Sequence, residues 1–143
     1  MIHEPEGQEG RPVAAVPLYF SRTYDETMRL LHEARACIIR HSDAPSMSME
    51  ARLTFSRETM RLTTRLTAVM AWLLAQRAVH AGEITAHHAA SDAHALTARE
   101  LCLAEANRQE TTLLPRELQV LLEKSRALYA RIARLDAQVR ASA

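Results

Sequence analysis

The sequence predicts an all-α protein: an antiparallel three-helix bundle with a long central helix and a short extra helix or loop before the last one. Three observations support this fold class. Glycine is scarce, at 3 of 143 residues, and the abundant residues are helix formers such as alanine and leucine. Valine and isoleucine never alternate with polar residues over the length of a strand. Three segments instead repeat apolar residues at three- and four-residue steps, the period of a helix that buries one face.

The N-terminal 16 residues are rich in glutamate, glycine and proline and predict a disordered acidic tail, which leaves residues 17–143 as one domain. A first helix is predicted to end near His41 and to begin at Ser21 or Thr23, because Thr23 and Glu26 can form a capping box. Its apolar stripe consists of Tyr24, Met28, Leu31, Ala34 and Ile38.

The central helix is predicted over residues 49–80. The preceding residues 42–48 have the composition of a turn, and Ser46 or Ser48 can cap the helix. Gly82 lies where a left-handed residue ends a helix. Two apolar faces are expected to need two sets of neighbours: the first consists of Met49, Leu53, Met60, Thr67, Met70 and Leu74, the second of Phe55, Leu62, Leu66, Val69 and Leu73.

The run AVMAWLLA, residues 68–75, is apolar around the whole helix at its middle. It is too short to cross a bilayer, which takes about 20 residues. It is therefore expected to be buried between the first and last helices. Trp72 adds a third side, and a second subunit is the simplest cover for it, so the sequence predicts a homodimer.

Residues 83–96 are polar and predict a loop or a weakly packed helical turn, whereas Thr97 and Glu100 form a capping box that predicts a short helix over about residues 98–108. Pro115 is expected at the first position of the last helix. That helix has an a/d heptad pattern, which predicts shallow packing in a bundle. The pattern consists of Leu118, Leu121, Ser125, Leu128, Ile132, Leu135 and Val139, widened by Leu122 and Tyr129.

Cys37 and Cys102 form no Cys-x-x-Cys pair and are expected to be small buried apolar residues with reduced thiols. No signal segment opens the chain, so a cytoplasmic protein that is not attached to a membrane is expected. The formal net charge of +1 makes no general case for nucleic acid. The sequence contains no glycine-rich phosphate loop and no nucleophile motif, so no enzyme activity and no cofactor are expected.

Two clusters of polar residues have alternative interpretations. Arg57, Arg61 and Arg65 lie four residues apart and form one stripe, which could bind an acidic partner, a phosphate or nucleic acid, or could be a solvated face with pairs such as Glu58 with Arg61. The second cluster is a set of histidines, namely His80, His87, His88 and His94, with Glu83 and Asp92 nearby. A metal site through Glu83 and His87, or a metal-dependent enzyme, competes there with a solvated polar loop, and the loop is expected.

Several stretches resemble the alphaproteobacterial regulator-of-CtrA-degradation family. They are FSRTYDETMRLLHEAR at residues 20–35, ETMRLTTRLTAVMAWLLAQRAVHAGEI at 58–84, LP at 114–115 and SRALYARIARLD at 125–136. The resemblance covers the whole chain except the N-terminal tail. It implies a small dimeric three-helix bundle without catalytic activity.

Members of this family act as adaptors for the ClpXP protease. They bind ClpX together with its priming factor and hold cargo, notably the cell-cycle regulator CtrA. No family motif fixes the contacts, so the partner-binding residues are expected among polar residues of the matching helices. The candidates are Arg57, Arg61 and Arg65, followed by Tyr24 and Arg29.

Overall fold

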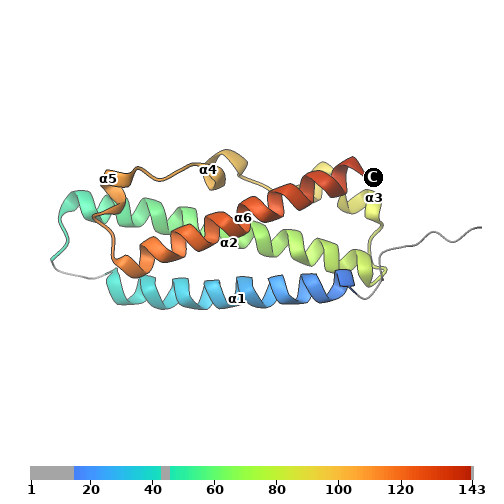
Figure 1. Ribbon diagram of the computed structural model, residues 1–143, viewed down its shortest axis with the longest axis horizontal. Coiled ribbons are helices and arrows are strands. Elements are labelled where there is room, and N and C mark those ends of the chain that lie inside the picture. The colour runs from blue at the N-terminus through green and yellow to red at the C-terminus, as the bar shows by residue number, and fades with distance from the viewer. Residues whose placement is uncertain (1–14, 43–45, 143) are drawn as a thin grey trace, which may run out of the picture.

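The protein is described by a computed structural model over residues 15–42 and 46–142, and within these ranges every regular element is a helix. Figure 1 shows the three long helices side by side as one bundle, which confirms the predicted all-α fold. The elements are α1 (Ala15–His41), α2 (Met49–His80), α3 (Ala86–Ala89), the 3₁₀ turn η1 (Asp92–His94), α4 (Arg99–Leu103), α5 (Arg108–Thr111) and α6 (Arg116–Ala141).

Helix α1 runs antiparallel to both α2 and α6, while α2 and α6 run in the same direction (Figure 1). Arg40 near the end of α1 pairs with Glu117 at the start of α6. Glu26, which lies earlier in α1, pairs with Arg131, which lies later in α6. The parallel pair exists because residues 81–115, which we call the return segment, run back along the bundle before α6 begins (Figure 1). A short loop would have made α6 antiparallel to α2.

Local sequence signals fix both ends of α2 as predicted. The Ser48 side chain accepts a hydrogen bond from the Ala51 amide at 3.1 Å and caps the first turn. Gly82 has a φ of +74°, and its amide and that of Glu83 donate to the carbonyls of Val79 and Ala78. This pair of hydrogen bonds is the Schellman motif, in which a glycine in the left-handed conformation lets two amides satisfy the last free carbonyls of the helix.

The predicted start of α1 was wrong. The helix begins at Ala15, so that Pro17 lies in the first turn, where its missing N–H costs nothing. Thr23 lies inside the helix and donates its hydroxyl to the Tyr19 carbonyl at 3.0 Å instead of forming a capping box. Apart from Ala15 and Val16, the predicted tail lies outside the described residues.

The bundle core lies along α6 and the second predicted face of α2. Leu62, Leu66 and Val69 of α2 are fully buried, as are Leu118 and Ile132 of α6. The heptad prediction for α6 is therefore confirmed, with Leu135 and Val139 partly buried at its end. Pro115 is the N-cap residue of α6, one position before the predicted one.

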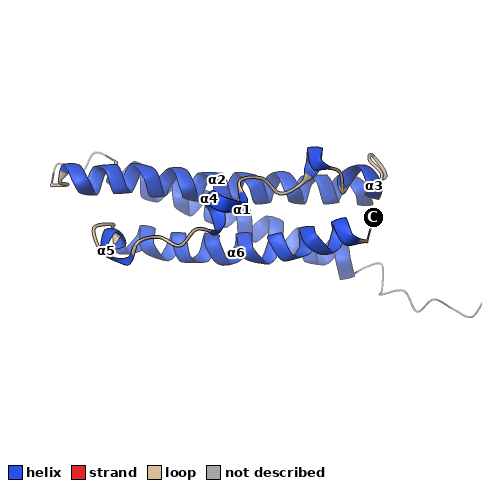
Figure 2. Cartoon of the chain, turned by 90° about the horizontal axis from the view of Figure 1, so that it is seen from above, coloured by secondary structure: helices blue, strands red, loops and turns tan. Residues whose placement is uncertain are grey.

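The return segment packs along the seam between α2 and α6, and Figure 2 shows α4 over this seam. Its anchors Leu96, Cys102 and Leu114 are buried. The predicted capping box at Thr97 was wrong: Ala98 is the N-cap, in a left-handed conformation with a φ of 59°, and Thr97 gives its carbonyl to the Tyr129 hydroxyl. The short helix α4 ends at Leu103, because tertiary hydrogen bonds replace the helical ones beyond that point.

The run of residues 68–75 is enclosed largely by its own chain. Trp72 is 2% exposed, its ring packs edge-on against Phe20 of α1, and its indole N–H donates to Asp136 of α6 at 3.0 Å. The expectation that a second subunit covers Trp72 was therefore wrong, because the chain itself covers this side chain. The apolar side left open at this level is that of Leu74, which is 48% exposed.

The first predicted apolar face of α2 is uncovered in the chain. Leu53 and Met60 are 65% and 71% exposed, and together with Leu74 they recur at multiples of seven residues along the helix. Met49, at the start of the same face, is also exposed. We call the residues Met49, Leu53, Met60 and Leu74 the outer face of α2. Exposed apolar residues in line on one helix favour packing against another surface.

The stability of the protein is expected to fall between pH 10 and pH 12 through Tyr129. Burial raises the pKa of this phenol to about 12, from an ordinary 10.0, with nearby Cys102 adding to the shift. Because the folded-state pKa is the higher one, the contribution is complete below pH 10 and is lost as the pH rises towards 12. The loss is expected to reach up to about 3 kcal/mol. Urea unfolding at several pH values measures it.

The Tyr129→Phe variant is the control, since it keeps the ring and cannot ionise. At pH 8 its unfolding free energy should be lower than that of the wild type, because phenylalanine cannot donate the hydrogen bond that the Tyr129 hydroxyl makes to the Thr97 carbonyl. It should change less than the wild type between pH 10 and pH 12. Equal pH dependence in the two proteins would contradict the assignment.

Candidate functional site

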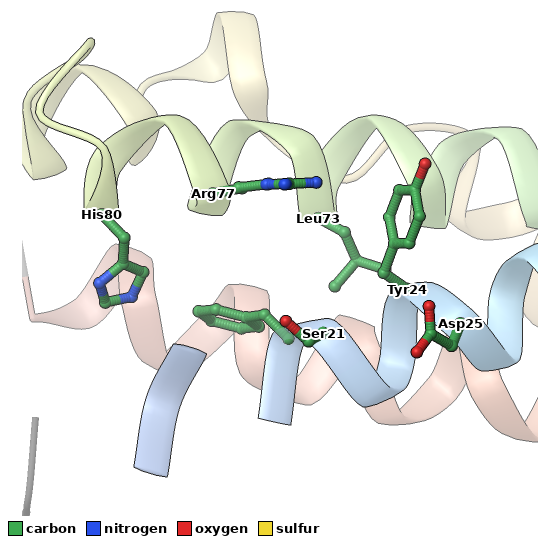
Figure 3. A pocket seen from close by; sticks show the side chains of 7 residues that line it. Ser21, Tyr24, Asp25, Leu73, Arg77 and His80 are labelled. Atoms are coloured by element: carbon green, nitrogen blue, oxygen red, sulfur yellow. The ribbon is translucent and has the colours of Figure 1, made fainter. Parts of the chain in front are cut away.

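The candidate functional site is a pocket of about 400 Å³ between the first turns of α1 and the last turns of α2. Figure 3 shows Arg77 and His80 of α2 facing Ser21, Tyr24 and Asp25 of α1. Phe20 and Leu73 complete the lining. The antiparallel course of the two helices places these residues together, because the start of α1 lies beside the end of α2.

Aromatic rings and charged groups alternate around the pocket. The Arg77 guanidinium carbon lies 6.0 Å from the centre of the Tyr24 ring, at the outer limit of a cation–π contact. The His80 ring lies 5.7 Å from that of Phe20. A carboxylate, Asp25, lies on the α1 side. A pocket that combines apolar rings with a few convergent polar groups is typical of a ligand-binding site.

Two of the predicted partner-binding residues belong to this region. Tyr24 lines the pocket, and Arg29 is exposed one helical turn beyond Asp25. The sequence reasoning missed Arg77, and it considered His80 only as a member of the histidine cluster. Both lie in the final turns of α2, near the predicted stop at Gly82, and the predicted bundle already placed that end beside the start of α1.

The other predicted residues, the arginine stripe, face the return segment. Arg57 pairs with Glu110 of α5 and lies 3.3 Å from Glu58. Arg61 is 12% exposed and donates to both carboxylate oxygens of Glu58, at 3.1 and 3.2 Å. The predicted pair of Glu58 with Arg61 is therefore present. Of the stripe, Arg57 offers the most exposed side chain, at 48%.

Arg65, the third member of the stripe, lies in the interior at 2% exposure. Its guanidinium donates to the carbonyls of Cys102 and Ala104 in the return segment, and to the Leu122 carbonyl and the Ser125 hydroxyl of α6. Burial lowers its pKa to about 10, so the group stays charged at neutral pH. Sequence spacing put Arg65 on the surface stripe, whereas the structure uses it to join three parts of the chain.

The histidine segment does not form the metal pair of Glu83 and His87 that was the alternative to a polar loop. Helix α3 begins at Ala86, so Glu83 and His87 do not share a helical face. The His88 and His94 rings contact each other edge-on, with centroids 4.9 Å apart, and Asp92 pairs with Arg140 at 2.7 Å. His87 and Asp92 are exposed, in keeping with the predicted polar loop.

Within the described part of the chain, one group of side chains has the chemistry and spacing to hold a metal ion: Cys37, His41 and Glu117. Sequence reasoning predicted no metal site. The Cys-x-x-x-His spacing on one helix was a visible signal, but Glu117 is 76 residues from His41 and only the fold places it there. Over the same described residues, no helix has an apolar stretch long enough to span a bilayer.

Comparison with known proteins gives two matches that agree. The family described as DUF1465, a protein of unknown function, matches residues 14–143. Among solved structures, the chain is similar to RcdA from Caulobacter crescentus CB15, with 36% sequence identity, a TM-score of 0.64, and coverage of 84% of this chain and 89% of that chain. A comparison with curated proteins gives no significant match.

Replacement of Arg65 by methionine should destabilise the return segment. The carbonyls of Cys102 and Ala104 would lose their donor in a buried setting, at an expected cost of about 2–4 kcal/mol in unfolding free energy. Hydrogen exchange of the amides in the return segment should accelerate first. Chemical denaturation and exchange mass spectrometry measure the two effects.

The matched control is Arg52→Met, which changes an exposed arginine of the same helix. Its unfolding free energy should stay within about 0.5 kcal/mol of the wild type. If Arg65→Met behaves like this control, the buried guanidinium does not hold the return segment.

Proposed function

The chain belongs to the RcdA-like family described as DUF1465, and from this membership we propose that it is a non-catalytic adaptor that helps to deliver specific cargo proteins to the ClpXP protease. The observation that carries the proposal is the 36% identity to RcdA over 84% of the chain. The cargo class is CtrA-like cell-cycle regulators, and the protein acts in the cytoplasm, where it meets ClpX and its priming factor.

The geometry suits an adaptor because the chain presents two separate surfaces. The α1–α2 pocket lies at one end of the bundle, whereas Met49 and Leu53 of the outer face of α2 lie near the opposite end of that helix. An adaptor that links cargo to the protease through two such surfaces needs no catalytic groups. It raises the effective concentration of cargo at the protease to about millimolar, so that weak contacts suffice.

Of the five predicted partner-binding residues, Arg29 and Arg57 are exposed and Tyr24 is half-buried in the pocket. Tyr24 lies in the pocket, Arg29 lies near it, and Arg57 lies at the edge of the return segment. We assign cargo docking to the pocket, with Tyr24 and Arg77 as its aromatic and cationic contacts. Arg29 contributes exposed charge near the docked partner, and Arg57 contributes exposed charge further away on α2, beside α5. Arg61 and Arg65 make their bonds within the chain, to Glu58, the return segment and α6, and take no part in docking.

A basic module for nucleic acid or a phosphorylated ligand is the weaker alternative. It depended on free cations in the arginine stripe, and those of Arg57 and Arg61 have carboxylate partners while Arg65 is buried. Phosphate binding would require these cations to leave their present partners.

We also propose that two copies pair through the outer face of α2. Its apolar residues are exposed, and a seven-residue spacing is the one that helices use to pack at a shallow angle. Ile39 of α1 is 62% exposed and lines an apolar groove of about 490 Å³ beside Thr63 of α2. This groove widens the surface that a second copy would cover.

The adaptor proposal predicts faster cargo destruction by purified ClpXP and its priming factor when this protein is added. The measurement is the half-life of fluorescently labelled CtrA-like regulators. Tyr24→Ala and Arg77→Ala should each raise the adaptor concentration needed for half-maximal acceleration by about tenfold or more, which corresponds to about 1.4 kcal/mol of lost binding.

Two variants serve as controls for this assay. Tyr24→Phe keeps the ring and should retain acceleration, and Arg52→Ala removes an exposed arginine of α2 outside the pocket lining. Unchanged half-lives for every regulator tested, with the intact protein present, would refute the adaptor function. Normal acceleration by both pocket variants would instead move docking to another surface.

The pairing proposal predicts that the wild-type chain is a dimer by light scattering at micromolar concentration. The double variant Leu53→Lys/Met60→Lys should be monomeric, because charges on the outer face of α2 oppose its burial. Leu113→Lys is the control, since Leu113 is 39% exposed on the return segment. A monomeric wild type, or a double variant that stays dimeric, would contradict pairing through this face.

A further inference from the structure

The end of the bundle opposite the pocket contains a cluster that the adaptor function does not use. Cys37 and His41 lie one turn apart on the same face of α1, and Glu117 lies in the first turn of α6. The Cys37 Sγ, a ring nitrogen of His41 and a carboxylate oxygen of Glu117 all lie within 4.8 Å of one another. The return segment creates this meeting, because it carries the chain back to the end of α1 before α6 begins.

We propose that Cys37, His41 and Glu117 form a binding site for a zinc-class divalent transition metal ion that joins α1 to α6. One thiolate, one imidazole and one carboxylate form the sulfur, nitrogen and oxygen set that zinc accepts in proteins. Three protein ligands leave the fourth tetrahedral position for water. The site lies outside every residue assigned above to cargo docking or pairing.

The spacing of the ligand atoms fits a tetrahedral ion. His41 Nε2 and Glu117 Oε2 are 3.4 Å apart. Ligands about 2.0–2.1 Å from a tetrahedral zinc ion are separated by roughly 3.3 Å. The Cys37 Sγ needs to approach by at most about 1 Å, which a small side-chain rotation supplies. The metal can enter from solvent, since His41 and Glu117 are 29% and 40% exposed.

Arg40 is placed to orient the carboxylate without occupying the metal position. It pairs with Glu117 Oε1, whereas Oε2 faces His41. Hydrogen-bonded partners that orient a ligating carboxylate are a regular feature of metal sites. Arg40 therefore holds one oxygen of Glu117 and leaves the other for the ion.

Metal binding at this cluster displaces the Cys37 thiol proton to solvent. The Cys37 thiolate and the Glu117 carboxylate then carry two negative charges, which balance a divalent ion, and the His41 imidazole supplies the third ligand.

Titration of the purified full-length chain with Co²⁺ under reducing conditions tests the site. One equivalent per chain should bind and produce a thiolate-to-cobalt charge-transfer band, which excess Zn²⁺ should remove by displacement. Zn²⁺ should also raise the melting temperature, because the ion binds only where the fold brings α1 and α6 together.

Cys37→Ala, His41→Gln and Glu117→Gln should each weaken Co²⁺ binding by tenfold or more. Glu117→Gln is the informative variant if Cys37→Ala fails to fold, since Glu117 is partly exposed and its amide can still accept from Arg40. Cys102→Ala and His94→Gln are matched controls, because they remove another buried cysteine and a histidine of the polar loop.

Binding that is lost in all three ligand variants and kept in both controls supports the proposal. Three results overturn it: no charge-transfer band in the wild type, an unchanged affinity for Co²⁺ in Glu117→Gln, or binding that depends on His94 instead. In those cases the cluster is a structural ion-pair network, in which Glu117 of α6 pairs with Arg40 and His41 of α1. The assay does not involve protease, so its outcome is separate from that of the adaptor experiment.

Discussion

The fold depends on one buried guanidinium. Arg65 of α2 supplies donors to two carbonyls of the return segment, one carbonyl of α6 and one hydroxyl of α6. Without these bonds the return segment would leave polar backbone groups unpaired against the apolar seam of α2 and α6, which is costly in a buried setting. Arg126 adds a second anchor of the same kind, with its Nε and Nη2 both donating to the Leu103 carbonyl at 3.0–3.1 Å.

The course of the return segment decides what lies at each end of the bundle. It carries the chain from the end of α2 back to the end of α1, and α6 then runs parallel to α2 (Figure 1). One end combines the start of α1 with the end of α2, because these two helices are antiparallel, and forms the aromatic and cationic pocket around Tyr24 and Arg77. The opposite end combines the end of α1 with the start of α6 and brings Glu117 to Cys37 and His41. A short α2–α6 loop would have started α6 at the pocket end of the bundle, away from Cys37 and His41.

Burial on α2 explains why charge in the sequence was a poor guide to binding residues. Arg57, Arg61 and Arg65 are equivalent in spacing, yet their exposures run from half-exposed to buried. The difference comes from the return segment, which covers the stripe progressively and supplies Glu110 as a partner for Arg57. The pocket residues Arg77 and His80, by contrast, stay accessible because the return segment leaves the helix at Gly82.

The sequence by itself determined the helices and the limits of α2. Ser48 and Gly82 act through hydrogen bonds to residues a few positions away, so the ends of α2 could be predicted without tertiary information. The heptad repeat of α6 likewise predicts which face of that helix is buried. Tertiary structure decided what contacts what. Thr23 and Thr97 have good capping sequences, but α1 starts earlier and Tyr129 takes the Thr97 carbonyl. Trp72 is covered by Phe20 and Asp136, and Arg65 is buried against the return segment and α6. These contacts join residues dozens of positions apart in the sequence, so no local sequence pattern could have predicted them.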